Sequence, residues 1–133
     1  MAVNGASKTH RKSLGRRGET LAARMLRSKG YVIRGRNFHT REGEIDLIAE
    51  SDGVLIFVEV KTARSGAFGH PADKVDLRKQ RRMALAAEAY LLENRLDETD
   101  CRFDVIAIRI GKSGPVVEHI EDAFEIDTDG LES

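Results

Sequence analysis

The stretch GEIDLIAESDGVLIFVEVKT, residues 43–62, decides the fold of this protein. It holds two apolar runs, Glu44–Glu50 and Val54–Lys61, on either side of the turn residues Ser-Asp-Gly. Runs of this kind around a tight turn predict an antiparallel β-hairpin. In the first run, alternation places Ile45 and Leu47 together on one face. The second run is apolar on both faces, which predicts a central strand covered from both sides.

The remaining elements are predicted from helical spacing, strand-like runs and turn signals on either side of this hairpin. We expect a helix over Leu14–Lys29, a strand over Tyr31–Phe38, a mobile loop over Thr62–Asp73, a helix over about Lys74–Asn94 with Asp73 or Asp76 as its N-cap, a strand over Arg102–Ile110 and a short last strand over Val116–Phe124. The order α-β-β-β-α-β-β predicts an α/β sandwich with a mixed central sheet flanked by helices.

Length and composition indicate one globular domain. The chain has 133 residues, of which 41% are hydrophobic and 33% charged, and these values exclude a disordered protein. We expect a flexible basic tail over residues 1–13, a single domain over residues 14–126 and an acidic tail over residues 127–133. No apolar run approaches the roughly 20 residues of a membrane span. The single cysteine, Cys101, excludes an internal disulfide and suits the cytoplasm; it is expected to be a packing residue rather than a nucleophile.

The charges are unevenly distributed along the chain, although the formal net charge is zero. Residues 1–41 carry eleven Lys or Arg and one acid, whereas residues 93–133 carry four Lys or Arg and twelve Asp or Glu. This asymmetry predicts one surface that faces a polyanion and another that is acidic. An ordinary solvated surface is the alternative interpretation.

Three charged side chains interrupt the apolar hairpin: Asp46 in the first run, and Glu59 and Lys61 in the second. Glu59 and Lys61 lie one pleat apart on one face, and the expected register brings Asp46 close to both. Two partly buried carboxylates repel each other, and a bound cation removes that cost. Mg²⁺ (or Mn²⁺) needs few protein oxygens, so we expect Asp46, Glu59 and the carbonyl of Val60 to hold it.

A lysine next to such a site can hold or polarise the attacking water, or stabilise charge on phosphoryl oxygens. The three residues therefore predict a site that hydrolyses phosphodiester bonds, with Lys61 assisting the nucleophile. Glu19, the only acid in the first 41 residues, is expected to add a fourth group from the first helix. The simpler interpretation is an ion pair that closes two strand ends, and the position of Asp46 across the hairpin weighs against it.

Asp46 followed by Glu59-Val60-Lys61 resembles the signature of the PD-(D/E)XK nuclease superfamily, although Ile45 stands where a proline is usual. Residues 15–38, 43–62 and 79–91 resemble the bacterial YraN family, and the likeness covers roughly residues 15–125. It implies a restriction-endonuclease-like fold related to archaeal Holliday-junction resolvases. Glu19 then corresponds to the glutamate of their first helix. Those resolvases are two-fold dimers, so a homodimer is expected by analogy.

The resemblance also implies that Gln80 belongs to the edge of the site, where it would orient a water or a phosphate. An exposed polar residue on the first helical turn is an equally good interpretation of Gln80.

Basic residues are expected to form the nucleic-acid-binding surface. Four of them share one face of the second predicted helix, at positions i, i+4, i+7 and i+8: Lys74, Arg78, Arg81 and Arg82. Other arginines extend this surface: Arg16, Arg17, Arg34, Arg36, Arg41 and Arg64. Such residues contact phosphates and give affinity without sequence preference. Because the chain has five Phe, two Tyr and no Trp, stacking on single strands is disfavoured and duplex or branched DNA is the expected partner.

Taken together, these patterns predict a Mg²⁺- or Mn²⁺-dependent endonuclease that cleaves DNA, with branched or structured DNA as the expected form. One alternative is a non-catalytic nucleic-acid-binding module on the same fold. Another is an adaptor whose acidic C-terminal part binds a basic partner. Neither alternative requires buried acids that face a phosphate.

Overall fold

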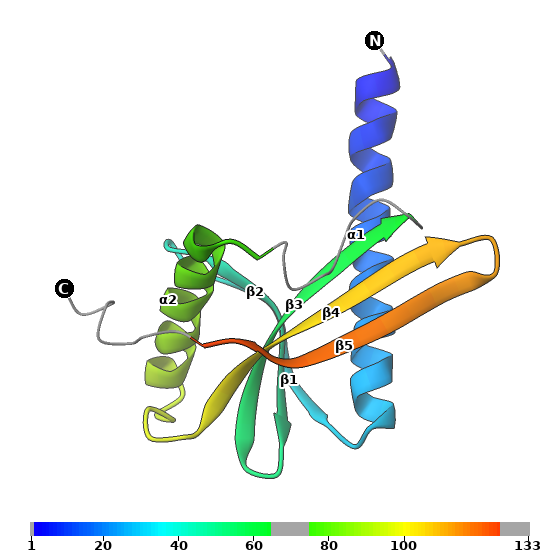
Figure 1. Ribbon diagram of the computed structural model, residues 1–133. Helices are drawn as coiled ribbons and strands as arrows, with labels where there is room; N and C mark the ends of the chain where they lie inside the picture. Colours follow the sequence, from blue (N-terminus) through cyan, green and yellow to red (C-terminus); the bar gives the residue numbers. More distant parts are fainter. Residues whose placement is uncertain (1, 65–74, 126–133) are drawn as a thin grey trace.

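The computed structural model describes residues 2–64 and 75–125, with side chains from residue 14 onward. The elements, in chain order, are α1 (Ala2–Ser28), β1 (Val32–His39), β2 (Glu44–Ser51), β3 (Val54–Arg64), α2 (Leu77–Glu93), β4 (Cys101–Gly111) and β5 (Gly114–Phe124). This is the order predicted from the sequence. Figure 1 shows a twisted sheet between the two helices, with the β4–β5 hairpin projecting past the other strands.

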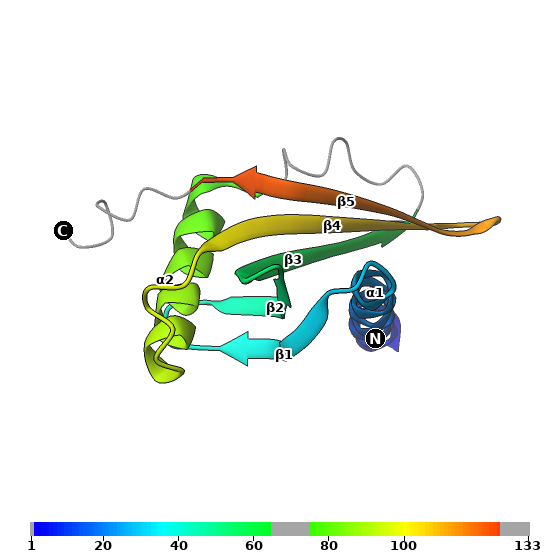
Figure 2. The same cartoon turned by 90° about the horizontal axis from the view of Figure 1, so that it is seen from below.

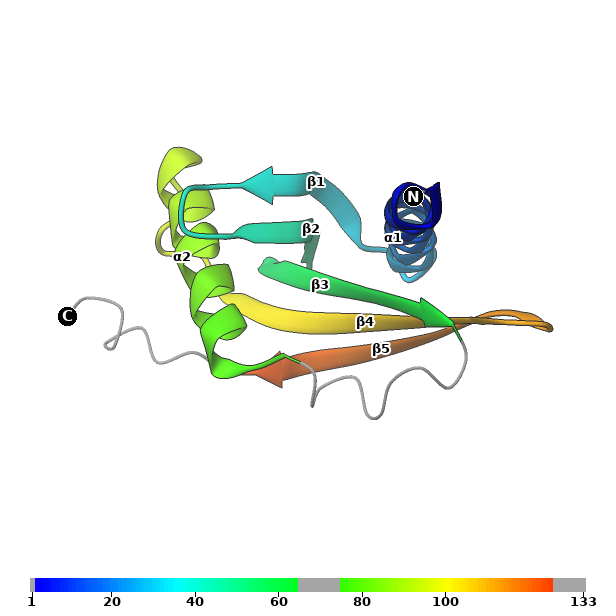
Figure 3. The same ribbon diagram turned by 90° about the horizontal axis from the view of Figure 1, so that it is seen from above.

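The five strands form one mixed sheet in the order β1-β2-β3-β4-β5, with β3 at its centre. Only β3 and β4 pair in parallel; the other neighbours are antiparallel. A parallel pair needs a long crossover, and here α2 supplies it between β3 and β4. Figures 2 and 3, from below and above, show the strands in this order and the two helices well apart.

Each face of the sheet is covered by one helix, which produces two apolar layers. On the α1 side, Ile56 and Val58 of β3 pack with Leu26 of the helix. On the α2 side, Leu55 and Phe57 pack with buried residues of α2. The prediction that β3 is apolar on both faces is therefore confirmed. The architecture is α/β and consistent with a restriction-endonuclease-like fold.

Helix and strand ends differ from the predictions in several places. The helix α1 begins at Ala2 rather than at Leu14, which shows that low local propensity is a weak guide to a helix start. Strand β5 spans 11 residues and is not short, because it pairs with β4 over nearly its whole length. Strand β3 continues to Arg64, so the first residues of the predicted loop are strand. The rest of that loop lies outside the described residues.

The helix α2 begins at Leu77, after the predicted N-cap Asp76. The Asp76 carboxylate accepts a hydrogen bond of 2.8 Å from the backbone nitrogen of Lys79, as an N-cap does. Asn94 caps the other end, where the sequence placed it. The end of β3 and the start of α2 matter here because both border the candidate site.

Candidate functional site

Asp46 lies where the pairing between β2 and β3 stops. The last pair of that ladder is Leu47 with Val58, in the predicted register. At the next position the backbone nitrogen of Val60 donates to Oδ2 of Asp46, at 2.8 Å. A side-chain carboxylate thus replaces a backbone acceptor, and the acid is held at the edge of the two strands.

The alternation of β2 changes at this position, which corrects one prediction. Ile45 packs with Ile48 in the α2-side core, whereas Leu47 packs in the α1-side core. Ile45 and Leu47 therefore do not share a face. The pairing of β2 with β1 stays in register here, from Arg36 with Leu47 to His39 with Glu44, so the difference lies in which helix each side chain packs against.

The charges of two carboxylates from other elements, Glu59 of β3 and Glu19 of α1, act on Asp46 here. Glu59 of β3 is 6% exposed. Burial, the charge of Glu59 and the charge of Glu19 on α1 raise the pKa of Asp46 to about 8, although the Val60 N–H and Lys79 act in the opposite direction. Burial has the largest effect on this pKa, and repulsion by the charge of Glu59 has the next largest. The predicted approach of Asp46 to Glu59 and Glu19 is thus consistent with the electrostatics of the site.

Lys79, in the first turn of α2, is a site residue that the sequence analysis missed. Its ammonium forms an ion pair and hydrogen bond with Oε1 of Glu59. Burial lowers the pKa of Lys79, but the nearby charge of Glu59 and this hydrogen bond outweigh burial, so that the pKa is raised. The sequence carried a signal for this. Lys79 is four residues before Met83 and seven before Ala86, both buried, so helical spacing places Lys79 on the side of α2 that faces the sheet.

Two glycines allow the helices to come this close to the sheet. A Cβ atom at Gly18 would lie 1.8 Å from Oγ1 and 2.9 Å from Cβ of Thr62 on β3. A Cβ atom at Gly43 would lie 2.4 Å from the carbonyl oxygen of Arg82 on α2. Gly18 precedes Glu19 and Gly43 precedes β2, so both close approaches help position the acidic site.

A polar groove of about 410 Å³ lies at the start of α2, and its lining includes Lys79, the partner of Glu59. Its lining combines three basic side chains with two acids and a methionine: Arg78, Lys79, Arg82, Glu44, Asp76 and Met83. Arg82 is anchored there, since its Nε donates to the carbonyl oxygen of Glu42 at 3.1 Å. A groove with several cations suits a phosphate group.

The other residues predicted for the site are placed as follows. Lys61 is half-buried on β3, beside Ala107 of β4. Gln80 donates from Nε2 to the carbonyl oxygen of Val75 at 2.9 Å and so fastens the segment before α2. All nine arginines predicted for the nucleic-acid-binding surface are exposed: Arg16, Arg17, Arg34, Arg36, Arg41, Arg64, Arg78, Arg81 and Arg82. Lys74 lies outside the described residues. The roles of Lys61 and Gln80 remain predictions.

The donor set at Asp46 and Glu59 fits a hard divalent cation. Within residues 2–64 and 75–125, no group of three His, Cys, Asp or Glu side chains is arranged to hold a metal ion. Mg²⁺, however, keeps several waters and takes only one or two carboxylates. Asp46 lies beside the carboxylate of Glu59, with Lys79 as the nearby cation, and these acids have the charge that such an ion would neutralise.

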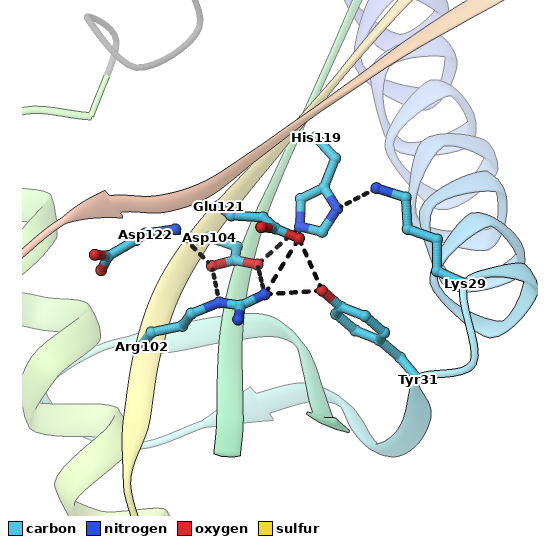
Figure 4. Close-up of polar contacts among 7 residues, drawn as sticks. All are labelled: Lys29, Tyr31, Arg102, Asp104, His119, Glu121 and Asp122. Carbon is cyan, nitrogen blue, oxygen red and sulfur yellow. Dashed lines mark hydrogen bonds and ion pairs between the residues drawn. The ribbon is translucent and has the colours of Figure 1, made fainter. Parts of the chain in front are cut away.

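A second polar cluster lies between the end of α1 and strands β4 and β5 (Figure 4). At its centre is Asp104, which is fully buried. It accepts hydrogen bonds from Arg102, from Nε2 of His119 at 2.7 Å and from the backbone nitrogen of Asp122 at 2.9 Å. Burial by itself would raise the pKa of Asp104, but these hydrogen-bond donors have the larger effect, so the pKa is lowered.

The outer contacts of this cluster tie α1 to the sheet. Nη2 of Arg102 donates to the hydroxyl of Tyr31 at 2.8 Å, and that hydroxyl donates to Glu121 at 3.0 Å. Lys29 lies 2.9 Å from Nδ1 of His119. Because an ammonium can only donate, Nδ1 accepts and the proton on Nε2 points to Asp104. The acceptors here are matched by donors, so the cluster is structural.

Cys101, at the start of β4, is exposed, so the prediction of a packing residue is wrong. Partial burial and Asp100 raise the pKa of its thiol, which is the opposite of what a nucleophilic cysteine needs. In the helices of the described part, no segment has the length and apolar character to cross a membrane.

Comparison with known proteins identifies the family. The model of the uncharacterised protein family UPF0102 matches residues 18–108. A UPF0102 protein of Syntrophotalea carbinolica is 48% identical over 117 residues, which cover 88% of this chain and 95% of the relative. A UPF0102 protein of Rhodococcus opacus is 47% identical over 116 residues, 86% of this chain and 98% of the relative. The chain therefore belongs to UPF0102, the YraN family, as its sequence motifs predicted.

Proposed function

We propose that this protein is a Mg²⁺- or Mn²⁺-dependent endonuclease that hydrolyses phosphodiester bonds in DNA. One observation carries the proposal: Asp46 and Glu59, from neighbouring strands, meet in a poorly solvated place beside a groove lined with basic side chains. Close acids are costly in a site that only binds phosphates, because they repel the ligand. They are useful when the ligand comes together with a metal ion.

In this proposal Asp46 and Glu59 hold the cation, and the carbonyl of Val60 is available as a further oxygen. The Val60 N–H keeps the Asp46 carboxylate in place. Bound metal supplies Lewis-acid stabilisation of charge on the phosphoryl oxygens and makes water a better nucleophile. Lys61, one pleat from Glu59, orients the attacking water and adds positive charge, while Glu19 tunes the acids from α1.

The expected substrate is duplex or branched DNA. Arg78 and Arg82 line the groove and would contact backbone phosphates, which position a duplex without reading its sequence. Attack of a water oxygen on phosphorus forms the new P–O bond, and the bond to the leaving alkoxide oxygen breaks as that oxygen takes up a proton. Exposed arginines on α1 and near β2 would extend the contact surface.

The Glu59–Lys79 ion pair favours a second candidate, a nucleic-acid-binding module without catalysis. If that pair stayed closed, Lys79 would neutralise Glu59 permanently and no metal would be required. The groove would then bind phosphates through Arg78 and Arg82 alone.

The test is a cleavage panel of linear, flapped, four-way and single-stranded DNA, together with RNA, in Mg²⁺ and in Mn²⁺. We expect the wild type to nick DNA and Glu59→Gln to lose about a hundredfold or more in rate. The matched control is Glu50→Gln, because Glu50 is at the other end of β2 and pairs with Arg34 on the surface. If the wild type cleaves none of these substrates but binds duplex DNA, the binding module is the better description.

A further inference from the structure

Lys79 occupies a special position between the acids and the groove. Its ammonium pairs with Glu59, whose side chain is only 8% exposed, whereas the lysine side chain is 45% exposed. The charges of Asp46 and Glu44 also raise its pKa. The ammonium of Lys79 is therefore the shared counter-ion of Glu44, Asp46 and Glu59, at the place where a divalent ion would bind.

The surroundings of Lys79 permit it to move. The residue is in the first turn of α2 and lines the groove together with Arg78 and Arg82. Its exposed side can turn from Glu59 toward the groove without repacking the apolar core. Arg82, in contrast, is held by the carbonyl oxygen of Glu42.

We propose that Lys79 is a displaceable counter-ion that couples metal binding to phosphate binding. A divalent cation at Asp46 and Glu59 expels the ammonium, because two positive centres at one pair of acids repel each other. The released ammonium then joins Arg78 and Arg82 in the groove and contacts a DNA phosphate. The inference rests on the proposed function in one respect, namely that Asp46 and Glu59 bind the metal.

The direction of the effect follows from charge. Without metal, the ammonium of Lys79 is paired with Glu59 and is not available to a phosphate in the groove. With metal, the acids are neutralised and the ammonium is available to the phosphate. Each ligand therefore improves the binding of the other, and by linkage the factor is the same in both directions.

The first experiment measures Mn²⁺ affinity by calorimetry at pH 8.5, in the full chain without DNA. Lys79→Met should bind Mn²⁺ about tenfold more tightly than the wild type, since no ammonium has to be displaced. Lys79→Arg keeps the charge and should stay within threefold of the wild type. If Lys79→Met does not fold, Lys79→Gln takes its place.

The matched control is Lys112→Met, in the exposed turn between β4 and β5. Val105 is the β4 partner of Glu59, and Lys112 is seven residues further along, roughly 20 Å away. Its Mn²⁺ affinity should equal that of the wild type. Equal or weaker Mn²⁺ binding by Lys79→Met, or no Mn²⁺ binding by the wild type, would overturn the inference.

The second experiment measures fluorescence anisotropy of a labelled 20-base-pair duplex with and without Ca²⁺, in the same variants. Ca²⁺ is also an oxygen-seeking cation. The tightening of duplex binding by Ca²⁺ should be at least threefold smaller in Lys79→Met than in the wild type. An equal tightening in both would refute the coupling. Neither experiment reads cleavage, so a protein with the predicted metal behaviour but without nuclease activity would contradict only the proposed function.

Discussion

Two aspartates in one sheet have opposite environments, one fully buried and the other partly buried. Asp104 of β4 is enclosed by donors from a guanidinium, an imidazole and a backbone N–H, and its pKa is lowered. Asp46 of β2 accepts a hydrogen bond from Val60 and has Glu59 and Glu19 as neighbours, and its pKa is raised to about 8. The first acid is satisfied within the fold. The second lies beside other acids, so that its charged form is disfavoured.

This difference separates a structural acid from one that is available for chemistry. When hydrogen-bond donors satisfy the oxygens of a buried carboxylate, they stabilise the fold and leave no oxygen lone pair for a ligand. A carboxylate close to other acids costs stability, and such strained groups gather at functional sites. The helix α1 serves both regions, since Glu19 reaches the acids and Lys29, just beyond its end, reaches the cluster around Asp104.

The largest expected effect comes from Asp104→Asn, which removes the buried anion that Arg102 and His119 share and leaves Arg102 with the exposed Glu121 at 3.6 Å. Breaking a buried charge pair costs about 3–5 kcal/mol, so the free energy of unfolding in urea should fall by this amount at pH 7. Asp97→Asn, at an exposed position after α2, is the control and should be neutral. A loss below about 1 kcal/mol would mean that the cluster around Asp104 is not structural.

Asp46→Asn should raise the free energy of unfolding, whereas Asp104→Asn lowers it. The pKa of Asp46 in the folded protein, about 8, is above the ordinary value of 3.8 for an aspartate, so the folded state holds its proton more tightly. The free energy of unfolding of the wild type should therefore fall as pH rises from about 4 to about 8 and stay low above that. Asn removes this titration but can still accept from Val60.

In metal-free buffer with EDTA at pH 9, we expect Asp46→Asn to be more stable than the wild type by about 2 kcal/mol. At pH 5 this advantage should shrink, as measured by urea unfolding at both pH values. For Asp104 the slope is reversed, because its lowered pKa contributes stability above about pH 4 that is lost as pH falls through the folded pKa. Equal stability of Asp46→Asn and the wild type at pH 9 would contradict the assignment of Asp46 as a strained acid.

The smallest expected effect concerns the way α1 brings Glu19 to the acids. Gly18→Ala places a Cβ against Thr62, and the helix must shift outward at the acidic site while its other end remains fixed near Tyr31. The cost of overpacking exceeds the gain in helix propensity, so stability should fall by about 1 kcal/mol. Gly15→Ala meets nothing within 4 Å and should stabilise by about 0.5 kcal/mol. The same sign for both variants, in thermal unfolding, would show that the close approach at Gly18 is unimportant.

The candidate site could be located from single residues because the chain interrupts its apolar pattern there. Asp46, Glu59 and Lys61 are conspicuous in strands that are otherwise apolar, and a hairpin has few registers that keep its core buried. Asp104 gave the same kind of signal within its own apolar strand, but its donors come from β4 and β5. The sequence around an acid does not show whether the fold will surround it with hydrogen-bond donors, as it does Asp104, or with other acids, as it does Asp46.

The sequence by itself determined the order of helices and strands, the two apolar faces of β3 and the family, because alternation and short motifs are local properties. Only the tertiary structure decided that Lys79 pairs with Glu59, that Ile45 and Leu47 separate around Asp46, and that β5 extends along β4. Each of these depends on how elements distant in the chain pack together. Packing also sets the environment of every charge, and that environment decides which acid supports the fold and which one is available to a ligand.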